Sequence, residues 1–257
     1  MINPFAPIGR GLLEVLAEIG RFAAFAGRAA GSCFSPPLFA GQFGRQAMQI
    51  GYFSLPVIGL TAVFIGAALA LNIYVGGARF NAESFVPNIV VLGITRELGP
   101  VLAGLMLAGR VSAGIAAEIG TMRVTEQIDA MTTLSTDPFR FLIAPRVLAA
   151  TLTLPLLVMV ADIIGVMGGY LVAVHSLGFN GATYLRNTFD FLESQDVILG
   201  LVKAAVFGFI IATVGAYQGY NSQGGALGVG RAATNAVVGA IVLILAVNYV
   251  LTAFFVE

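Results

Sequence analysis

Long apolar stretches, separated by short polar segments, occupy most of this sequence. A helix that crosses the hydrocarbon core of a membrane needs about 20 predominantly apolar residues. Five stretches reach that length, at about 52–75, 85–110, 147–174, 197–220 and 232–256. The pattern therefore predicts an all-α integral membrane protein with five transmembrane helices.

The segment before the first span has a different pattern, in which charged residues recur at steps of three, four or seven. This stripe consists of Glu14, Glu18, Arg21 and Arg28, and the opposite side of the same helix consists of Leu12, Leu16, Ile19, Phe22 and Ala23. An amphipathic helix of this kind suits the membrane surface, and it equally suits packing against the protein's own core. We divide the chain into an N-terminal interfacial segment, 1–45, and a five-span domain, 46–257.

Composition agrees with a membrane protein, and charge predicts its orientation. Of the 257 residues, 58% are hydrophobic and 10% are charged, with a mean hydropathy of +0.92, whereas a soluble domain carries about 25% charged residues. Basic residues collect on the cytoplasmic side of membrane helices. If the N-terminus is cytoplasmic, that side holds nine arginines and the outer side holds only Arg79, Arg186 and the border residue Lys203. We therefore expect a cytoplasmic N-terminus and an external C-terminus.

The sequence argues against several kinds of chemistry. A net charge of zero gives no basic surface for nucleic acid. The glycine-rich loop that binds ATP phosphates requires a lysine, and the single lysine, Lys203, stands in GLVKAA inside a span. One cysteine, Cys33, and one histidine, His175, do not make a zinc or haem ligand set. We expect no catalytic residue, no metal and no bound cofactor in this chain.

Arg96 and Glu97 are the only ionisable residues between 85 and 109. A charge at the centre of a spanning helix costs about 2.5–3.5 kcal/mol on insertion scales, so such residues face a protein interior or a wet cavity. Pro100 follows three residues after Glu97. It has no N–H to donate, and its ring presses on the carbonyl four residues earlier, that of Arg96. The two charges are therefore predicted to point inward, toward a pathway.

The segment 113–140, between the second and third spans, is too polar to cross a membrane and too short to be a domain. Helical spacing places Glu118, Met122, Thr125, Glu126 and Asp129 on one face. Exposed acids and flexible methionines suit a docking surface for another protein. An ordinary connecting loop with solvated charges explains the same residues, and periodicity alone does not choose between the two.

Small residues four apart indicate where helices pack closely. Gly165 and Gly169 form such a pair in the third span, and Gly215 and Gly219 form one in the fourth. Asp162 precedes the first pair, so we interpret it as a hydrogen-bonded structural group.

Several motifs together resemble the MlaE permease family. They are RELGPV at 96–101, AGR at 108–110, AEIGTMRVTEQIDAM at 117–131, DP at 137–138, PR at 145–146, LPLL at 154–157, GVMGG at 165–169 and GVGRAAT at 228–234. The resemblance extends from about Arg45 to the C-terminus, and its central run is long and specific.

The resemblance implies an interfacial helix followed by five spans, with a cytoplasmic coupling helix at about 115–133. Members of the family are permease subunits of ABC transporters that carry phospholipid between the inner and outer membranes of bacteria. The implied assembly is a homodimer in the inner membrane. Two ATPase subunits, which bind ATP and Mg, lie on its cytoplasmic side, an MCE-domain ring lies on its periplasmic side, and some complexes add a STAS-domain protein.

The resemblance also assigns roles to individual residues. The coupling helix contacts the ATPase, and its matching residues here are Glu118, Gly120, Met122, Arg123, Glu126, Gln127 and Asp129. The positions that match the lipid cavity are Tyr74, Arg96, Glu97 and Leu98, where Arg96 and Glu97 would neutralise each other or meet a lipid headgroup. Arg45 and Arg231 match basic positions near the cytoplasmic boundary, where snorkelling of long side chains also explains them.

Two other classes of function compete with this one. An ion-coupled transporter or channel would work without an ATPase and would use Arg96, Glu97 and Asp162 as a proton relay. Such folds usually carry inverted repeats, and five spans do not divide into equal halves. A membrane enzyme is disfavoured because the sequence offers no outward cluster of reactive residues.

Overall fold

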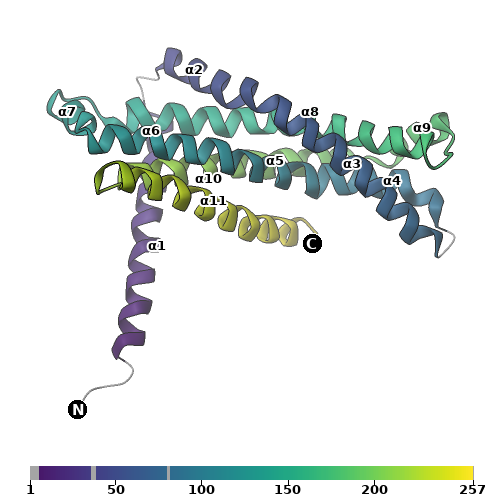
Figure 1. Ribbon diagram of the computed structural model, residues 1–257, viewed down its shortest axis with the longest axis horizontal. Coiled ribbons are helices and arrows are strands. Elements are labelled where there is room, and N and C mark those ends of the chain that lie inside the picture. The colour runs from purple at the N-terminus through teal and green to yellow at the C-terminus, as the bar shows by residue number, and fades with distance from the viewer. Residues whose placement is uncertain (1–5, 36–38, 80–81, 257) are drawn as a thin grey trace.

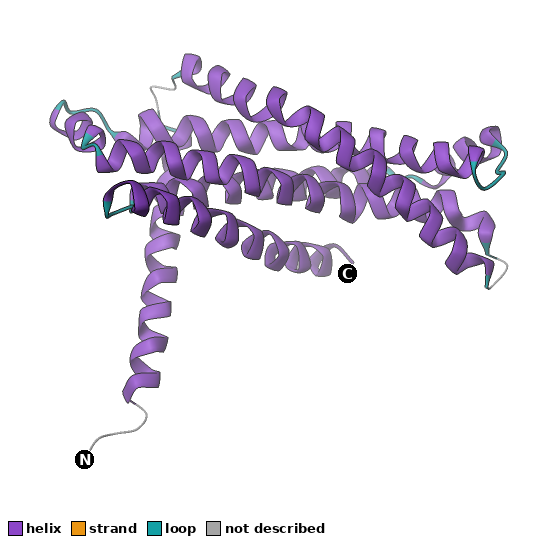
Figure 2. Cartoon of the chain, viewed as in Figure 1, coloured by secondary structure: helices purple, strands orange, loops and turns teal. Residues whose placement is uncertain are grey.

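The computed structural model describes residues 6–35, 39–79 and 82–256, and within these ranges every regular element is a helix (Figure 2). Five helices are long and apolar enough to cross a membrane. They are Ala40–Ala78, Glu83–Val124, Phe139–His175, Ser194–Tyr220 and Gly225–Phe255. The prediction of an all-α protein with five spans is confirmed.

Most spans consist of shorter helices that run into one another. The first contains α2 (Ala40–Gly51), η1 (Tyr52–Ser54) and α3 (Leu55–Ala78). The second contains η2 (Glu83–Phe85), α4 (Val86–Gly93), η3 (Ile94–Leu98), α5 (Gly99–Leu107), η4 (Ala108–Ser112) and α6 (Ala113–Val124). The third contains η5 (Phe139–Ile143) and α8 (Ala144–His175), and the last two are α10 (Ser194–Tyr220) and α11 (Gly225–Val256). Outside them lie α1 (Ala6–Cys33), α7 (Gln127–Thr133) and α9 (Gly181–Phe191).

The first two helices extend beyond the predicted spans. Polar residues mark the end of the apolar stretch, but they do not end a helix. The first begins at Ala40 rather than near 52, and the predicted boundary between 45 and 46 falls inside α2. The second continues to Val124 rather than ending near 110. The fourth agrees with the prediction to within a few residues. The third begins at Phe139 rather than near 147, and the fifth begins at Gly225 rather than near 232.

The fourth span, α10, lies at the centre of the bundle. In its most apolar stretch 61% of the residues are buried, against 11% in α11. Its glycines touch neighbouring backbones: a Cβ on Gly200 would lie 2.3 Å from the carbonyl oxygen of Thr95. On Gly215 and Gly219 it would lie 2.7 Å from a carbonyl oxygen of the second span. The predicted close packing at these two glycines is confirmed.

A second close crossing joins α3 to α8. A Cβ on Gly66 would lie 1.8 Å from the carbonyl oxygen of Gly165, and one on Gly168 would lie 2.4 Å from that of Val63. Gly169 meets Val90 in the same way, at 2.9 Å. The packing predicted at Gly165 and Gly169 is therefore present, and it brings the third span against both the first and the second.

The first half of α1 projects away from the bundle (Figure 1). Here Leu12, Leu16 and Ile19 are each more than half exposed, whereas Phe25 and Ala29 in the second half are buried. We expected this helix either to lie in the membrane surface or to pack on the protein's own core, and each alternative fits one half of it. The second half packs on the core, and the exposed apolar side of the first half is the part suited to a membrane surface.

A small cluster joins α1 to the C-terminal end of α10. Tyr217 donates a hydrogen bond of 2.6 Å from Oη to Oε1 of Glu18, and Arg21 pairs with the same carboxylate. Phe22 and Phe25 stack edge-on against the Tyr217 ring, with centroids 5.4 and 5.3 Å away. The bond from Tyr217, with that from Arg21, holds the pKa of Glu18 below its ordinary value.

Candidate functional site

The carboxylate of Glu97 is bound by residues of the fourth and fifth spans. Lys203 Nζ donates to Glu97 Oε1 at 2.7 Å, and Thr252 Oγ1 lies 2.9 Å from the same oxygen. Asn248 Nδ2 donates to Oε2 at 3.0 Å. Asn248 and Thr252 are four residues apart on α11 and therefore share one face. Three spans converge on this one carboxylate.

Pro100 accounts for a second bond of the same lysine. In a regular helix the N–H of residue 100 would donate to the carbonyl of Arg96, and proline has no N–H. The backbone around Arg96 and Glu97 forms the wide turn η3, a π-helical segment that ends just before Gly99 and Pro100. Lys203 Nζ donates to the Arg96 carbonyl oxygen at 2.9 Å. The side chain of the fourth span thus serves a carbonyl that the proline leaves without its usual donor.

Lys203 is fully buried, with an exposed fraction of 0%, while the side chain of Glu97 keeps 36% of its surface exposed. A buried ammonium is tolerated only when it is paired and hydrogen-bonded, and Lys203 has three acceptors in Glu97, Thr252 and the Arg96 carbonyl. Glu97 meets this requirement for Lys203 and still reaches the surface of the single chain.

Two roles were expected for Arg96 and Glu97, and the first, mutual neutralisation, is wrong because the two side chains do not pair. Contact with a lipid headgroup stays a prediction. Arg96 Nε lies 3.6 Å from Asp196 Oδ1, while Glu97 turns to Lys203. Consecutive residues of a helix point in different directions, and each charge therefore finds its own partner. Asp196 and Lys203 are seven residues apart on α10, which places them on one face two turns apart.

Sequence reasoning missed the four partners of this pair. Lys203 was assigned to the outer border of its span, although it is the only lysine of the chain and is surrounded by apolar residues. Asn248 and Thr252 are polar residues with helical spacing in a charge-free span. Isolated polar residues inside spans are the signal that would have found them.

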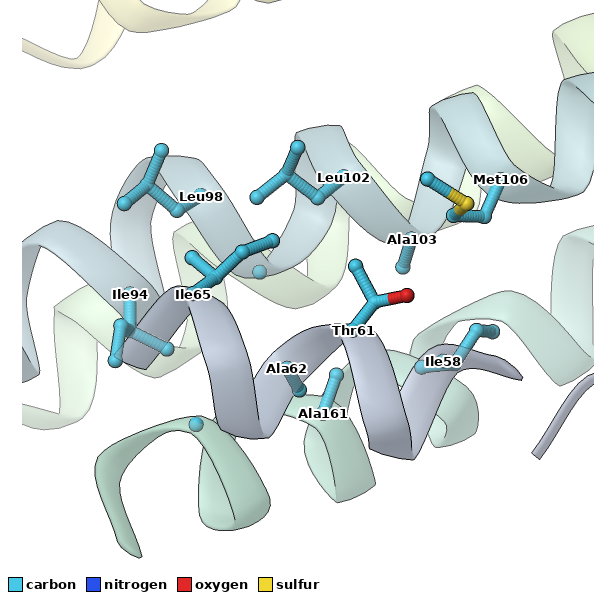
Figure 3. Close-up of a pocket in the computed structure, with 12 residues that line it drawn as sticks. Ile58, Thr61, Ala62, Ile65, Ile94, Leu98, Leu102, Ala103, Met106 and Ala161 are labelled. Atoms are coloured by element: carbon cyan, nitrogen blue, oxygen red, sulfur yellow. The ribbon is translucent and has the colours of Figure 1, made fainter. Parts of the chain in front are cut away.

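The pocket beside this network is too small for a lipid. It has a volume of about 20 Å³, and its lining residues include Ile58, Ile65, Leu98, Leu102 and Met106 (Figure 3). A single water molecule needs about 10–15 Å³ measured in this way. Leu98 is the only predicted cavity residue that lines it. The single chain has no lipid-sized space at this point.

Tyr74 lies in a different part of the structure. Its ring packs edge-on against Phe179, with centroids 5.9 Å apart, in a cluster that also holds Tyr184. That cluster includes residues of α3, α4, α8 and α9. The structure therefore gives Tyr74 a packing role in the single chain and does not bring it to Glu97.

The predicted coupling helix at 115–133 is two helices. The second span continues as α6 to Val124, and α7 begins at Gln127. Between them Glu126 has φ of +60°, the left-handed conformation, which interrupts the helix. The single face predicted for Glu118, Met122, Thr125, Glu126 and Asp129 is therefore broken between the third and fourth of these residues.

Several residues of this segment hold the fold. Arg146 is buried, and its Nη2 lies 2.7 Å from Glu118 Oε1, which ties α6 to α8. Arg123 Nη1 lies 2.6 Å from Asp129 Oδ1 across the turn between α6 and α7. The carbonyl oxygen of Gly120 accepts from Ser222 Oγ at 3.3 Å.

The remaining residues predicted to contact the ATPase are Met122, Glu126 and Gln127. Glu126 and Gln127 are exposed, and Met122 is half-buried against the core. Figure 1 places α7 at the end of the bundle opposite α9. Both the docking role and the alternative of an ordinary connecting loop stay predictions, and the residues that combine exposure with the fewest internal contacts are Glu126, Gln127 and the exposed side of α7.

The two boundary arginines are exposed. Arg45, on α2, lies beside an open cleft that Phe39, Gln42 and Phe141 also line. Arg231 is exposed near the start of α11. Both positions are consistent with side chains that reach toward a membrane boundary.

Asp162 is not hydrogen-bonded as predicted. Its Oδ1 is buried and has no partner among the described residues. A Cβ on Gly99 would lie 1.9 Å from this oxygen, so the carboxyl faces a bare backbone where a larger residue would have stood. The carboxyl of Asp162 is therefore packed directly against the Gly99 backbone.

The described residues provide neither a proton relay nor a metal site. Arg96 pairs with Asp196 and Glu97 with Lys203, and no bond links either pair to Asp162 in the described ranges. In the same ranges no three His, Cys, Asp or Glu side chains gather as metal ligands do. The geometry is that of a packed membrane bundle with one polar junction between three spans.

Known proteins resemble this chain along nearly its whole length. The family model described as Permease MlaE matches residues 43–254. A protein of Rickettsia bellii named "Probable ABC transporter permease protein" is 54% identical and covers 99% of this chain and 98% of its own. The "Intermembrane phospholipid transport system permease protein MlaE" of Haemophilus influenzae is 31% identical, with 98% and 97% covered. The chloroplast protein TRIGALACTOSYLDIACYLGLYCEROL 1 of Arabidopsis thaliana is 34% identical, with 82% and 60% covered.

Proposed function

The chain belongs to the MlaE permease family, and from that membership we propose that it carries phospholipid between the inner and outer membranes as the permease subunit of an ABC transporter. The observation that carries this proposal is the near full-length match to the Haemophilus protein, whose name specifies intermembrane phospholipid transport. The five-span bundle agrees with it, since a permease must cross the membrane.

The energy for transport comes from a partner ATPase in this proposal. The chain's only lysine is buried against Glu97 and cannot reach a nucleotide phosphate. ATP and Mg therefore bind to the partner, and this chain supplies no catalytic residue. Two ATPase subunits would serve a homodimer of the chain, from the cytoplasmic side.

The exposed surface around Glu126, Gln127 and α7 is the proposed docking site for the ATPase. The contact between Arg123 and Asp129 fixes α7 relative to α6. The second span is a continuous helical run from Glu83 to Val124. A displacement of α7 would therefore be transmitted along this helix to Glu97.

The lipid cavity is proposed to form between two copies of the chain. The space beside Leu98 in a single chain holds no lipid, and the side chains of Arg96 and Glu97 are 29% and 36% exposed. A second copy facing these residues would enclose a cavity that one copy lacks. With the N-terminus cytoplasmic and the C-terminus periplasmic, the cavity would open toward an MCE-domain ring, and a STAS-domain protein would join on the cytoplasmic side.

Co-purification of the chain in mild detergent, followed by mass spectrometry of bound proteins and lipids, tests this function. We expect an ATPase and phospholipid in the complex. Gln127→Trp places a large side chain on the proposed docking surface, and Ala182→Trp places the same side chain on exposed α9 at the opposite end. The first variant should lose the ATPase and the second should keep it.

Two results would contradict the proposal. One is an ATPase retained at the wild-type ratio by Gln127→Trp, which would move the docking surface elsewhere. The other is transport by the purified chain alone in liposomes under a pH gradient, which would establish the ion-coupled alternative.

A further inference from the structure

A polar pocket lies between α2 and the inner part of the second span, away from the Glu97 network. It has a volume of about 250 Å³. Its polar lining residues are Gln46, Gln49, Arg110 and Glu118, and its apolar lining residues are Ile50, Val111, Gly114 and Ile115. Arg110 follows Glu97 by 13 residues of continuous helix, a rise of about 20 Å. The pocket is thus at the level where the apolar part of the span ends and lipid headgroups begin.

Arg110 has hydrogen-bond partners but no carboxylate partner among the described residues. Nη1 donates to Ser54 Oγ at 2.5 Å, and Nη2 reaches the Gln49 carbonyl oxygen at 3.5 Å. The Phe53 ring lies 6.0 Å from the guanidinium carbon. All three contacts are neutral, and the acid that lines the same pocket, Glu118, forms its ion pair with Arg146. A guanidinium at a membrane boundary is well suited to bind a phosphate group.

The pocket also offers hydrogen-bond acceptors, from Gln46 on α2 and from Glu118, about two turns beyond Arg110 on the second span. Gln46 is 7% exposed and its side chain lines the pocket, where its amide oxygen can accept a hydrogen bond. Glu118 uses Oε1 for the buried Arg146, which leaves Oε2 as a further acceptor. The pocket therefore contains both a cation and hydrogen-bond acceptors.

This arrangement distinguishes between phospholipid headgroups. A primary ammonium donates hydrogen bonds to an amide oxygen and a carboxylate. A trimethylammonium donates none and is usually held by aromatic rings, and the pocket has no aromatic lining residue among those described. The acceptors therefore favour ethanolamine over choline. Because Glu118 is already paired with Arg146, the ammonium adds a bond to Oε2 and does not replace the existing one.

We propose that this pocket binds the headgroup of phosphatidylethanolamine, with the phosphate on Arg110 and the ammonium between Gln46 and Glu118. The site is separate from the cavity between two copies and belongs to the cytoplasmic boundary of the bundle. It rests on the proposed function only in that this end of the chain contacts phospholipid.

Gly114 gives a selective way to fill the pocket. It lines the pocket, and a Cβ added to it meets no atom within 4 Å. Gly109 is also free of neighbours within 4 Å, lies on the same helical run and is not a lining residue. Gly114→Leu therefore occupies the site, and Gly109→Leu adds the same side chain beside it.

The experiment uses the full chain in nanodiscs that contain equal amounts of phosphatidylethanolamine, phosphatidylcholine and phosphatidylglycerol. Lipids that stay bound after detergent extraction are counted by mass spectrometry. We expect an excess of phosphatidylethanolamine that falls about tenfold in Gly114→Leu, since a charge-assisted hydrogen bond is worth about one factor of ten. Gly109→Leu should keep the excess. Gln46→Met, which removes the amide at similar volume, should lower the excess of ethanolamine over choline lipids, because only Glu118 then accepts from the ammonium.

Thermal unfolding of each variant checks that it is folded, and a folded Gly114→Leu that keeps the lipid excess overturns the proposal. Equal retention of the three lipids by the wild-type chain overturns it as well. If free phosphorylethanolamine raises the thermal stability of the chain as much as the lipid does, the site binds a soluble ligand and the proposal of a lipid is wrong. Because lipid retention is measured without an ATPase, failure here leaves the proposed transport function to its own test.

Discussion

Removal of Lys203 tests whether the junction of three spans depends on its charge pair. In Lys203→Met the carboxylate of Glu97 keeps Asn248 and Thr252 but loses its cation, and the Arg96 carbonyl loses a donor. In Glu97→Gln the fully buried ammonium of Lys203 keeps only neutral acceptors. The double variant removes both charges together.

The expected magnitudes follow from burial. Breaking a buried ion pair by removing one partner costs about 3–5 kcal/mol of unfolding free energy, while replacing both partners is far milder. Lys203→Met should be at the lower end, because the Glu97 side chain is 36% exposed and water stabilises part of its charge. Glu97→Gln should be at the upper end, because Lys203 is 0% exposed. The double variant should lose about 3 kcal/mol or less, well below the sum of the two single losses.

Reversible denaturant unfolding of the purified chain in detergent measures all four proteins of this cycle. The exposed pair Arg186 and Asp190 on α9, with side chains 82% and 70% exposed, provides a matched control cycle. Its coupling should be about 0–1 kcal/mol, as for other surface pairs. Additive losses at Lys203 and Glu97 would refute the reasoning, because they would mean that the two charges do not stabilise each other.

Two further predictions concern packing and acid stability. Gly66→Ala should lower the unfolding free energy by about 1–3 kcal/mol, because its Cβ would lie 1.8 Å from a backbone oxygen of α8. Gly76→Ala in the same helix, with no atom within 4 Å, should be neutral or slightly stabilising in the same assay. Tyr217→Phe should raise the pKa of Glu18 toward its ordinary value. A depressed pKa stabilises the fold above the unfolded pKa and loses that effect as the pH falls through the folded pKa. Wild-type thermal stability should therefore fall more than that of Tyr217→Phe below about pH 4.5, and equal slopes would contradict the role of this bond.

The spans could be predicted from sequence because the apolar stretches that define them are local. The predicted third span at 147–174 and the observed α8 at Ala144–His175 nearly coincide. The end of the second span was misjudged because Arg110 and Glu118 suggested that it had left the membrane. The helix continues to Val124 all the same, since its backbone bonds do not depend on the solvent around it.

The partners of the functional residues could not be predicted in this way. Glu97 meets Lys203 and Thr252 across 106 and 155 residues of sequence. Periodicity describes one helix at a time and does not say which helices adjoin. The sequence did identify the carbonyl of Arg96 as disturbed by Pro100, and only the structure shows that a lysine bonds to it.

The break in the docking segment was also invisible in the sequence. Glu126 adopts a left-handed conformation, which glycine or asparagine adopts more readily. The predicted helical spacing therefore continued through Glu126, where the chain in fact turns. Glu118 is half exposed, and its ion pair with Arg146 could not be predicted because Arg146 lies beyond the segment 113–140.

The distance along the chain between Glu97 and its partners has a consequence for how the protein is made. Glu97 leaves the ribosome before Lys203, which follows 106 residues later, or about 5 to 20 s at bacterial rates of synthesis. During that interval the second span has two charges and neither of its final ion pairs. It must wait in a partly wet environment, at the insertion machinery or at the membrane surface, until α10 arrives. The junction of three spans thus forms late in biogenesis. Substitution of Lys203 should slow the membrane integration of the second span, although that span is synthesised earlier.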